Sequence, residues 1–240
     1  MEHAFSQESR KLQVIAHIHT EFPEKFGLPR QSGLVPGLQG EIVFTEEYRQ
    51  AESLRGLEDF SHIWLLWGFS AAERKGWSPT VRPPRLGGNK RMGVFATRSP
   101  FRPNPIGLSC VKLEEICLQG PNGPILRVSG ADLMDGTPIY DIKPYLPYTD
   151  SRPEASGGFA EPLRDYRLEV DIPVELLERI PKERQEALRE VLAQDPRPSY
   201  QQDPERVYGM DFAGMALKFT VQDGRLQLLS LEKQEEKKQR

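Results

Sequence analysis

The residues best suited to hold an anionic ligand lie in the segment RMGVFATRSPFRPNPIGLS, residues 91–109. Arg98 and Arg102 flank Phe101. A guanidinium group can bind a carboxylate or phosphate through two hydrogen bonds, and an aromatic ring offers a surface on which a base can stack. Three prolines between residues 100 and 105 lack an N–H and favour extended conformations. The spacing therefore predicts a stiff loop that keeps these side chains in place.

Positive charge surrounds this segment. No Asp or Glu occurs between residues 74 and 112, whereas nine Lys or Arg residues do, among them Arg82 and Arg85. Because the whole chain has a formal net charge of −3, the remainder carries −12. A focused positive region on an acidic protein indicates an anionic partner. The alternative is a proline-rich surface loop whose arginines are only solvated.

Carboxylates are concentrated instead in the segment DLMDGTPIYDIKPYLPYTD, residues 132–150. It contains Asp132, Asp135 and Asp141. The pair Asp135-Gly136 is a strong turn signal and can be no more than a turn. A carboxylate beside exposed backbone N–H groups also suits a ribose or an ammonium group, so the segment is a candidate ligand site.

A second rigid loop, residues 21–41, supplies Pro29, Arg30 and Gln31. These residues combine a restricted backbone, a fork of donors and an amide, and such loops often carry function. A plain surface connection is the alternative. His17 and His19 share one strand face, but no third ligand stands at a familiar spacing, so we expect no metal site.

Short strands bounded by turn signals dominate the first 150 residues, with one short helix at 46–54. They predict a mainly β fold, an antiparallel barrel or sandwich, because no Rossmann or Walker glycine motif accompanies them. We expect strands at 12–18, 41–45, 60–69, 91–97, 106–118 and 124–129, with 60–69 buried on both faces.

Composition changes to Ser, Pro, Gly and Glu near residue 153. We therefore expect a first domain at 1–152, a linker at 153–162, a small α+β domain at 163–232 and a charged tail at 233–240. The small domain should contain a strand at 165–171, helices within 173–194 and a hairpin at 215–228.

The bulk properties favour a soluble cytoplasmic protein. Mean hydropathy is −0.56, and the longest apolar run, Ile63–Trp67, is far shorter than a membrane span of roughly 20 residues. The amino terminus lacks the basic and then apolar pattern of a signal peptide.

Motifs across nearly the whole chain resemble the TsaA-like family and, more narrowly, the TrmO family within it. They are PRQSG at 29–33, RGLEDFSHIWLL at 55–66, VRPPRLGGNKRMGVFATRSPFRPNPIGLS at 81–109, DGTPIYDIKPYLPYTD at 135–150 and QDPRPSY at 194–200. The resemblance implies an S-adenosylmethionine-dependent enzyme on a single-sheeted antiparallel β-barrel, acting as a homodimer. The implied reaction adds a methyl group to N6 of threonylcarbamoyladenosine, 3′ of the anticodon, in threonine tRNAs that read ACY codons.

The resemblance also implies which residues contact the methyl donor. Some relatives have a histidine at the position of Ser70, so imidazole chemistry is not expected here. Asp141 is a candidate acceptor for the N6 proton, although water could accept it. The residues carried over by motif as donor contacts are Pro29, Arg30, Gln31, Ser70, Arg98, Leu108, Asp135, Gly136, Thr137 and Pro138.

For the tRNA, we expect Arg82, Arg85 and Arg102 to contact phosphates and Phe101 to meet an unstacked base. Two other classes of function stay open at this point. One is a non-catalytic RNA-binding module that uses the positive region. The other is a small-molecule enzyme with Asp135 and Asp141 as an acid/base pair.

Overall fold

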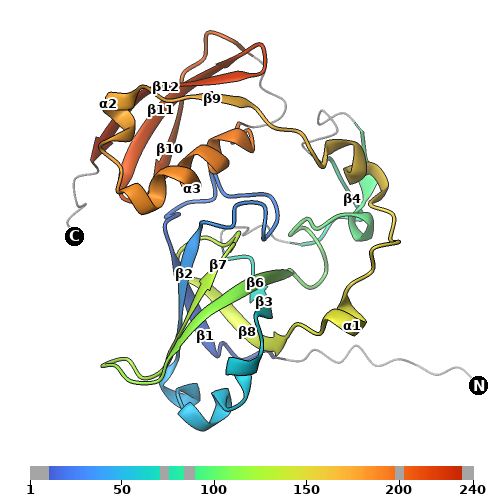
Figure 1. Cartoon of the computed structure of the whole chain (residues 1–240). Helices are drawn as coiled ribbons and strands as arrows, with labels where there is room; N and C mark the ends of the chain where they lie inside the picture. Colours follow the sequence, from blue (N-terminus) through green and yellow to red (C-terminus); the bar gives the residue numbers. More distant parts are fainter. Residues whose placement is uncertain (1–10, 71–75, 84–89, 198–202, 234–240) are drawn as a thin grey trace, which may run out of the picture.

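The computed structural model describes residues 11–70, 76–83, 90–197 and 203–233. Six antiparallel strands close into a barrel in the order β1-β2-β7-β6-β3-β8 (Figure 1). This confirms the predicted fold class. The strands are β1 (Ala16–Thr20), β2 (Gln39–Phe44), β3 (His62–Gly68), β6 (Ile106–Cys117), β7 (Ile125–Ser129) and β8 (Thr137–Pro144).

The barrel interior is filled by alternate side chains of these strands. Ile18, Ile42, Leu126 and Ile139 are fully buried in one cluster. In β3 only every second residue is buried over most of its length, so the expectation that both faces are buried is wrong. A barrel strand has one face inside and one outside, and the outer positions of β3 carry large side chains that are only partly covered.

The segment 91–97 is not a single strand as predicted. Only β5 (Met92–Gly93) pairs, with β4 (Thr80–Val81), and Val94–Ala96 then form a 3₁₀ turn. Val94 is buried, its N–H bonds to the carbonyl of Pro79, and its carbonyl accepts bonds from the N–H and hydroxyl of Thr97. These local bonds compete with strand pairing and turn the chain.

The predicted helix at 46–54 is likewise a series of 3₁₀ turns. They span Glu46–Tyr48 and Ala51–Leu54 and are followed by Leu57–Asp59, with Gly56 at a φ of +85° before the last turn. Among the described residues, no helix is long and apolar enough to cross a membrane.

The C-terminal unit is a four-stranded sheet, in the order β10-β11-β12-β9, with β9 parallel to β12. One face is covered by α3, whose buried residues include Leu188 and Leu192. Pro181 precedes α3 as predicted, whereas β10 was not foreseen and β9 is shorter than expected. The bounds are β9 (Glu169–Asp171), α2 (Val174–Leu177), α3 (Lys182–Ala193), β10 (Tyr208–Phe212), β11 (Met215–Gln222) and β12 (Arg225–Lys233).

The connection between β1 and β2 belongs to both units. Phe22, Val35 and Leu38 pack in the core of the C-terminal unit, although their segment leaves and re-enters the barrel (Figure 1). Glu21 Oε1 lies 2.6 Å from Arg184 Nε of α3. The loop that carries residues 29–31 is therefore held from two sides.

The chain between the two units contains α1 (Pro147–Asp150) and a 3₁₀ helix, η6 (Gly158–Leu163). The predicted linker at 153–162 thus contains regular structure. Figure 1 shows this segment passing beside β4 on its way to the C-terminal unit.

Candidate methyl-donor site

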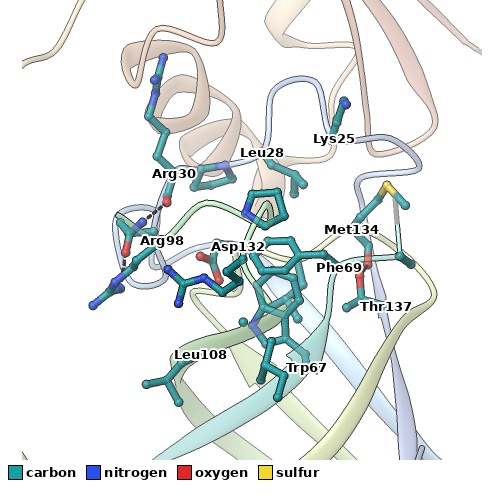
Figure 2. Close-up of a pocket in the computed structure, with 18 of the residues that line it drawn as sticks. Lys25, Leu28, Arg30, Trp67, Phe69, Arg98, Leu108, Asp132, Met134 and Thr137 are labelled. Carbon is teal, nitrogen blue, oxygen red and sulfur yellow. Dashed lines mark hydrogen bonds between the residues drawn. The ribbon is translucent and has the colours of Figure 1, made fainter. Parts of the chain in front are cut away.

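A cavity of about 660 Å³ opens at the end of the barrel where the C-terminal unit lies. Four segments surround it: the β1–β2 connection, the end of β3, the start of β6 with its preceding loop, and the turn before β8. Figure 2 shows their side chains converging from these separate parts of the sequence. The size is that of a typical small-molecule site.

The floor of the cavity is aromatic and apolar. The rings of Trp67 and Phe69 lie with centroids 4.4 Å apart, and Leu108 lies beside them, half exposed. A Cβ at Gly107 would stand 2.2 Å from Trp67 Cε2, so only glycine leaves room for the indole at this position of β6. The floor offers a surface on which a flat ring can stack.

A carboxylate forms part of the wall. Ser109 Oγ donates a hydrogen bond of 2.6 Å to Asp132 Oδ1 and accepts one of 3.0 Å from Trp67 Nε1. Burial raises the pKa of Asp132, although the bond from Ser109, backbone N–H groups including that of Ser32, and the charge of Arg98 oppose the rise. Of the described residues that line the cavity, Asp132 alone carries a carboxylate.

A cationic side faces this wall. Arg98 Nη1 donates a hydrogen bond to Gln31 Oε1, and Gln31 Nε2 donates to the carbonyl of Arg30 (Figure 2). The Arg30 guanidinium reaches the C-terminal unit, where Nη2 lies 3.5 Å from the carbonyl oxygen of Asp195. The structure thus brings together three predicted site residues from two distant segments.

The same Asp195 orders the start of the QDPRPSY motif. Its carboxylate accepts bonds of 2.8 and 2.9 Å from the Arg197 guanidinium and one of 3.1 Å from the Tyr166 hydroxyl. Residues 198–200 of the motif lie outside the described residues. The described part of this motif therefore supports the cavity through Arg30.

The predicted turn at 135–138 supports the site more than it lines it. Thr137 faces the cavity, and Gly136 has a φ of +73°, which allows the turn. The carboxylate of Asp135 instead accepts the N–H of Thr20 at 3.1 Å and lies 3.2 Å from His19 Nδ1. Asp135, Gly136 and Pro138 do not line the cavity.

Asp141 stands apart from the cavity. It lies four residues along β8 from Thr137, roughly 13 Å on an extended strand. Its Oδ2 is 2.9 Å from Lys143 Nζ in an exposed ion pair, and Oδ1 accepts the N–H of Ile142. The structure does not place this predicted proton acceptor with the other site residues, whereas Pro29 and Ser70 do line the cavity.

The four residues expected to meet tRNA have different surroundings. Arg102 donates through Nε to Ser99 O at 3.0 Å and through Nη2 to the carbonyls of Val94 and Thr97, so its guanidinium holds the loop. Phe101 lines the cavity, Arg82 lines a neighbouring groove, and Arg85 lies outside the described residues.

The sequence patterns did not predict Ser109 or Trp67 as site residues, and they indicated Asp132 only as one acid of the segment 132–150. The sequence carries one signal, the period-two alternation of Gly107, Ser109 and Val111 along an expected strand. In the structure all three positions of β6 face inward, and Ser109 is completely buried. A buried hydroxyl requires a partner. Among the described residues, no group of three His, Cys, Asp or Glu side chains could hold a metal ion.

Comparison with known proteins decides the family. Residues 17–151 match the model of the tRNA-methyltransferase O N-terminal domain, and residues 165–234 match that of the TrmO C-terminal domain. The chain belongs to the TrmO family of tRNA methyltransferases. A solved TrmO structure from Pseudomonas aeruginosa is 33% identical, with a TM-score of 0.75 over 96% of this chain and 100% of that chain.

Curated relatives that are named as methyltransferases agree with this assignment. The tRNA (adenine(37)-N6)-methyltransferase of Escherichia coli K12 is 44% identical over 93% of this chain and 98% of its own length. The Eikenella corrodens protein of the same name is 49% identical over 69% of this chain and 93% of its own. A Pseudomonas aeruginosa relative, 43% identical over 84% of this chain and 88% of its own, is named as an S-adenosylmethionine-dependent methyltransferase.

Proposed function

We propose that this TrmO-family chain uses S-adenosylmethionine to methylate N6 of threonylcarbamoyladenosine, 3′ of the anticodon, in threonine tRNAs that read ACY codons. The names of the relatives support N6 methylation of a tRNA adenine. The observation that carries the donor assignment is the cavity itself, in which an aromatic floor, an arginine side and one carboxylate converge.

The cavity residues fit this methyl donor. Its carboxylate end suits Arg98, which Gln31 holds in place. Its adenine suits the surface of Trp67 and Phe69. Its cationic sulfur suits the carboxylate of Asp132, since opposite charges attract strongly where water is partly excluded. When bound, S-adenosylmethionine supplies an electrophilic methyl group for in-line displacement.

The chain's own contribution is mainly positioning. The prolines at 100, 103 and 105 and the guanidinium of Arg102 fix the loop that carries Arg98. Ser32 links the β1–β2 connection, which carries residues 29–31, to the barrel, because its hydroxyl accepts a hydrogen bond of 3.1 Å from the N–H of Cys110. Holding two reactants in one geometry can supply several kcal/mol of barrier reduction.

Asp132 is better placed than Asp141 to accept the proton that N6 loses. It faces the cavity, and its raised pKa makes its carboxylate a stronger base than an ordinary Asp. Ser109 and the Ser32 backbone fix its orientation. We propose this role for Asp132 in place of Asp141.

We further propose that the chain acts in the cytoplasm as a homodimer. The resemblance of its motifs and the many polar residues on loops around one small barrel support this assembly. Equilibrium sedimentation at micromolar concentration tests it, and a fully active monomer would refute it.

The decisive test of the function is mass spectrometry of tRNA nucleosides from cells lacking the protein, with re-addition of the purified chain and S-adenosylmethionine. We expect the methylated threonylcarbamoyladenosine to be absent from tRNA of the cells lacking the protein. It should reappear when the purified chain and S-adenosylmethionine are added. A chain that binds tRNA without saturable donor affinity would be an RNA-binding module. Activity on small molecules without RNA would favour an acid/base enzyme.

A further inference from the structure

A second hollow, of about 1400 Å³, continues outward from the donor cavity. The two share five lining residues, Arg30, Gln31, Arg98, Pro100 and Phe101. One wall of the outer groove is the β4–β5 ribbon with the 3₁₀ turn after it, and the other includes Phe159 of η6. A ligand reaching the donor cavity from this side would lie along the groove.

The charged side chains in the described lining of the groove are all positive. Arg30, Arg82, Arg91 and Arg98 line it, and its described lining contains no Asp or Glu. Arg91 Nη1 lies 3.4 Å from the hydroxyl of Thr80, so this guanidinium is oriented along the ribbon. A cationic channel of this kind suits the phosphate backbone of a nucleic acid.

Two large aromatic side chains in the groove are exposed. Trp77 is 53% and Phe95 is 77% solvent accessible, which is unusual for residues of this size. Both stand on ordered backbone: the N–H of Ser78 bonds to Phe101 O at 3.1 Å, and that of Val94 bonds to Pro79 O at 3.0 Å. The backbone next to each ring is therefore held in place, and the exposed rings offer surfaces for stacking.

We propose that this groove binds the unpaired nucleotides of the anticodon loop next to the target adenosine, with bases stacked on Trp77 and Phe95 and phosphates at Arg82 and Arg91. Stacking on aromatic rings beside cations is the chemistry by which proteins hold single-stranded RNA. Duplex RNA keeps its bases stacked on one another and gains little from such rings. The inference rests on the proposed function, because it names how that substrate is held.

The test measures the affinity of the full-length protein for a fluorescent anticodon stem–loop RNA and for a hairpin-free duplex of the same stem. Trp77→Ala and Phe95→Ala should each weaken stem–loop binding roughly tenfold, within the range for loss of a base stack, and leave duplex binding unchanged. Trp77→Phe should retain most of the affinity. Tyr148→Ala is the matched control, since Tyr148 is 85% exposed on α1 and lies outside both hollows.

The salt dependence of RNA binding tests the proposed phosphate contacts separately. Arg91→Gln should reduce the magnitude of the salt slope of stem–loop binding by about one unit, while the calorimetric affinity for S-adenosylmethionine stays at the wild-type value. Unchanged stem–loop affinity in both alanine variants, or equal losses for stem–loop and duplex, would overturn the proposal. So would a change from dimer to monomer in Trp77→Ala, because a second copy of the chain would then cover the groove.

These outcomes are distinct from failure of the proposed function. If no tRNA is methylated but the aromatic variants still lose stem–loop affinity, the groove assignment stands and the reaction is wrong. If methylation is observed but the aromatic variants bind RNA as the wild type does, the reaction stands and the groove assignment is wrong.

Discussion

The hydroxyl of Ser109 donates a 2.6 Å hydrogen bond to the carboxylate of Asp132 and so joins the interior of the barrel to the wall of the donor cavity. Ser109 is completely buried, and Trp67 donates to the same hydroxyl. The carboxylate is therefore held by a chain of hydrogen bonds that begins at the cavity floor. Disturbing any member should alter the position or charge of Asp132.

We expect Ser109→Ala to lower the methylation rate by about tenfold, because a hydrogen bond to a charged group contributes about 1.5–3 kcal/mol. Loss of that bond also removes an interaction that lowers the pKa of Asp132. The acid limb of the pH–rate profile should therefore move to higher pH. Single-turnover methylation across pH tests this, with Ser109→Thr, which keeps a hydroxyl, as the control. An unmoved acid limb would contradict the prediction.

Asp132→Asn should reduce methylation roughly 100-fold, the lower end of the range for a general base. Burial raises the pKa of Asp132, so its active, ionised form is lost as pH falls through that raised value. The acid limb of the wild-type profile should be absent from the variant. A variant that keeps both the wild-type rate and the acid limb would show that water alone accepts the proton.

Asp141→Asn should leave methylation within about twofold of the wild type. Asp141 lies outside the cavity, and its ion pair with Lys143 is exposed, so its loss should cost at most about 1 kcal/mol of stability. Initial rates and the midpoint of urea unfolding measure both effects. A large loss of rate with unchanged stability would support Asp141 as the proton acceptor.

Arg98 and Arg82 should separate donor binding from tRNA binding. Arg98→Ala should weaken S-adenosylmethionine binding by about 1–3 kcal/mol, because it leaves the carboxylate of the bound donor without its proposed partner. Arg82→Ala should leave donor affinity unchanged and lower the salt slope of tRNA binding by about one unit. Calorimetry and salt titrations measure the two quantities, and a wild-type salt slope in Arg82→Ala would remove this residue from the phosphate contacts.

Arg184→Ala should destabilise the fold by up to about 3 kcal/mol, because it leaves Glu21 buried without its partner. Burial already raises the pKa of Glu21, and Arg184 opposes that rise, so the variant should raise it further. The penalty should be present at neutral pH and should shrink as pH falls through the raised pKa, where Glu21 takes up a proton. Urea unfolding at several pH values tests this. The double variant Glu21→Gln, Arg184→Met should recover stability, and a pH-independent penalty would exclude the charge of Glu21 as its cause.

Local sequence signals determined much of this protein. Apolar patterns and turn signals located five of the six barrel strands, although β1 (Ala16–Thr20) lies later than the expected 12–18 and β8 (Thr137–Pro144) was not predicted. The prolines at 100, 103 and 105 ended regular pairing before β6 began at Ile106. Pro181 and the pair Asp223-Gly224 located the start of α3 and the turn of the last hairpin. These features depend on backbone preferences of a few adjacent residues, so sequence alone suffices for them.

The tertiary structure alone decided which side chains share the site. Asp132 and Asp135 are three residues apart, yet the turn at Gly136 leaves one carboxylate in the cavity and aims the other at the end of β1. Arg98 and Arg102 are four apart, yet one meets Gln31 and the other binds its own loop. Closure of the barrel and packing of the C-terminal unit set these directions, because contacts between segments distant in the chain leave no local pattern in the sequence.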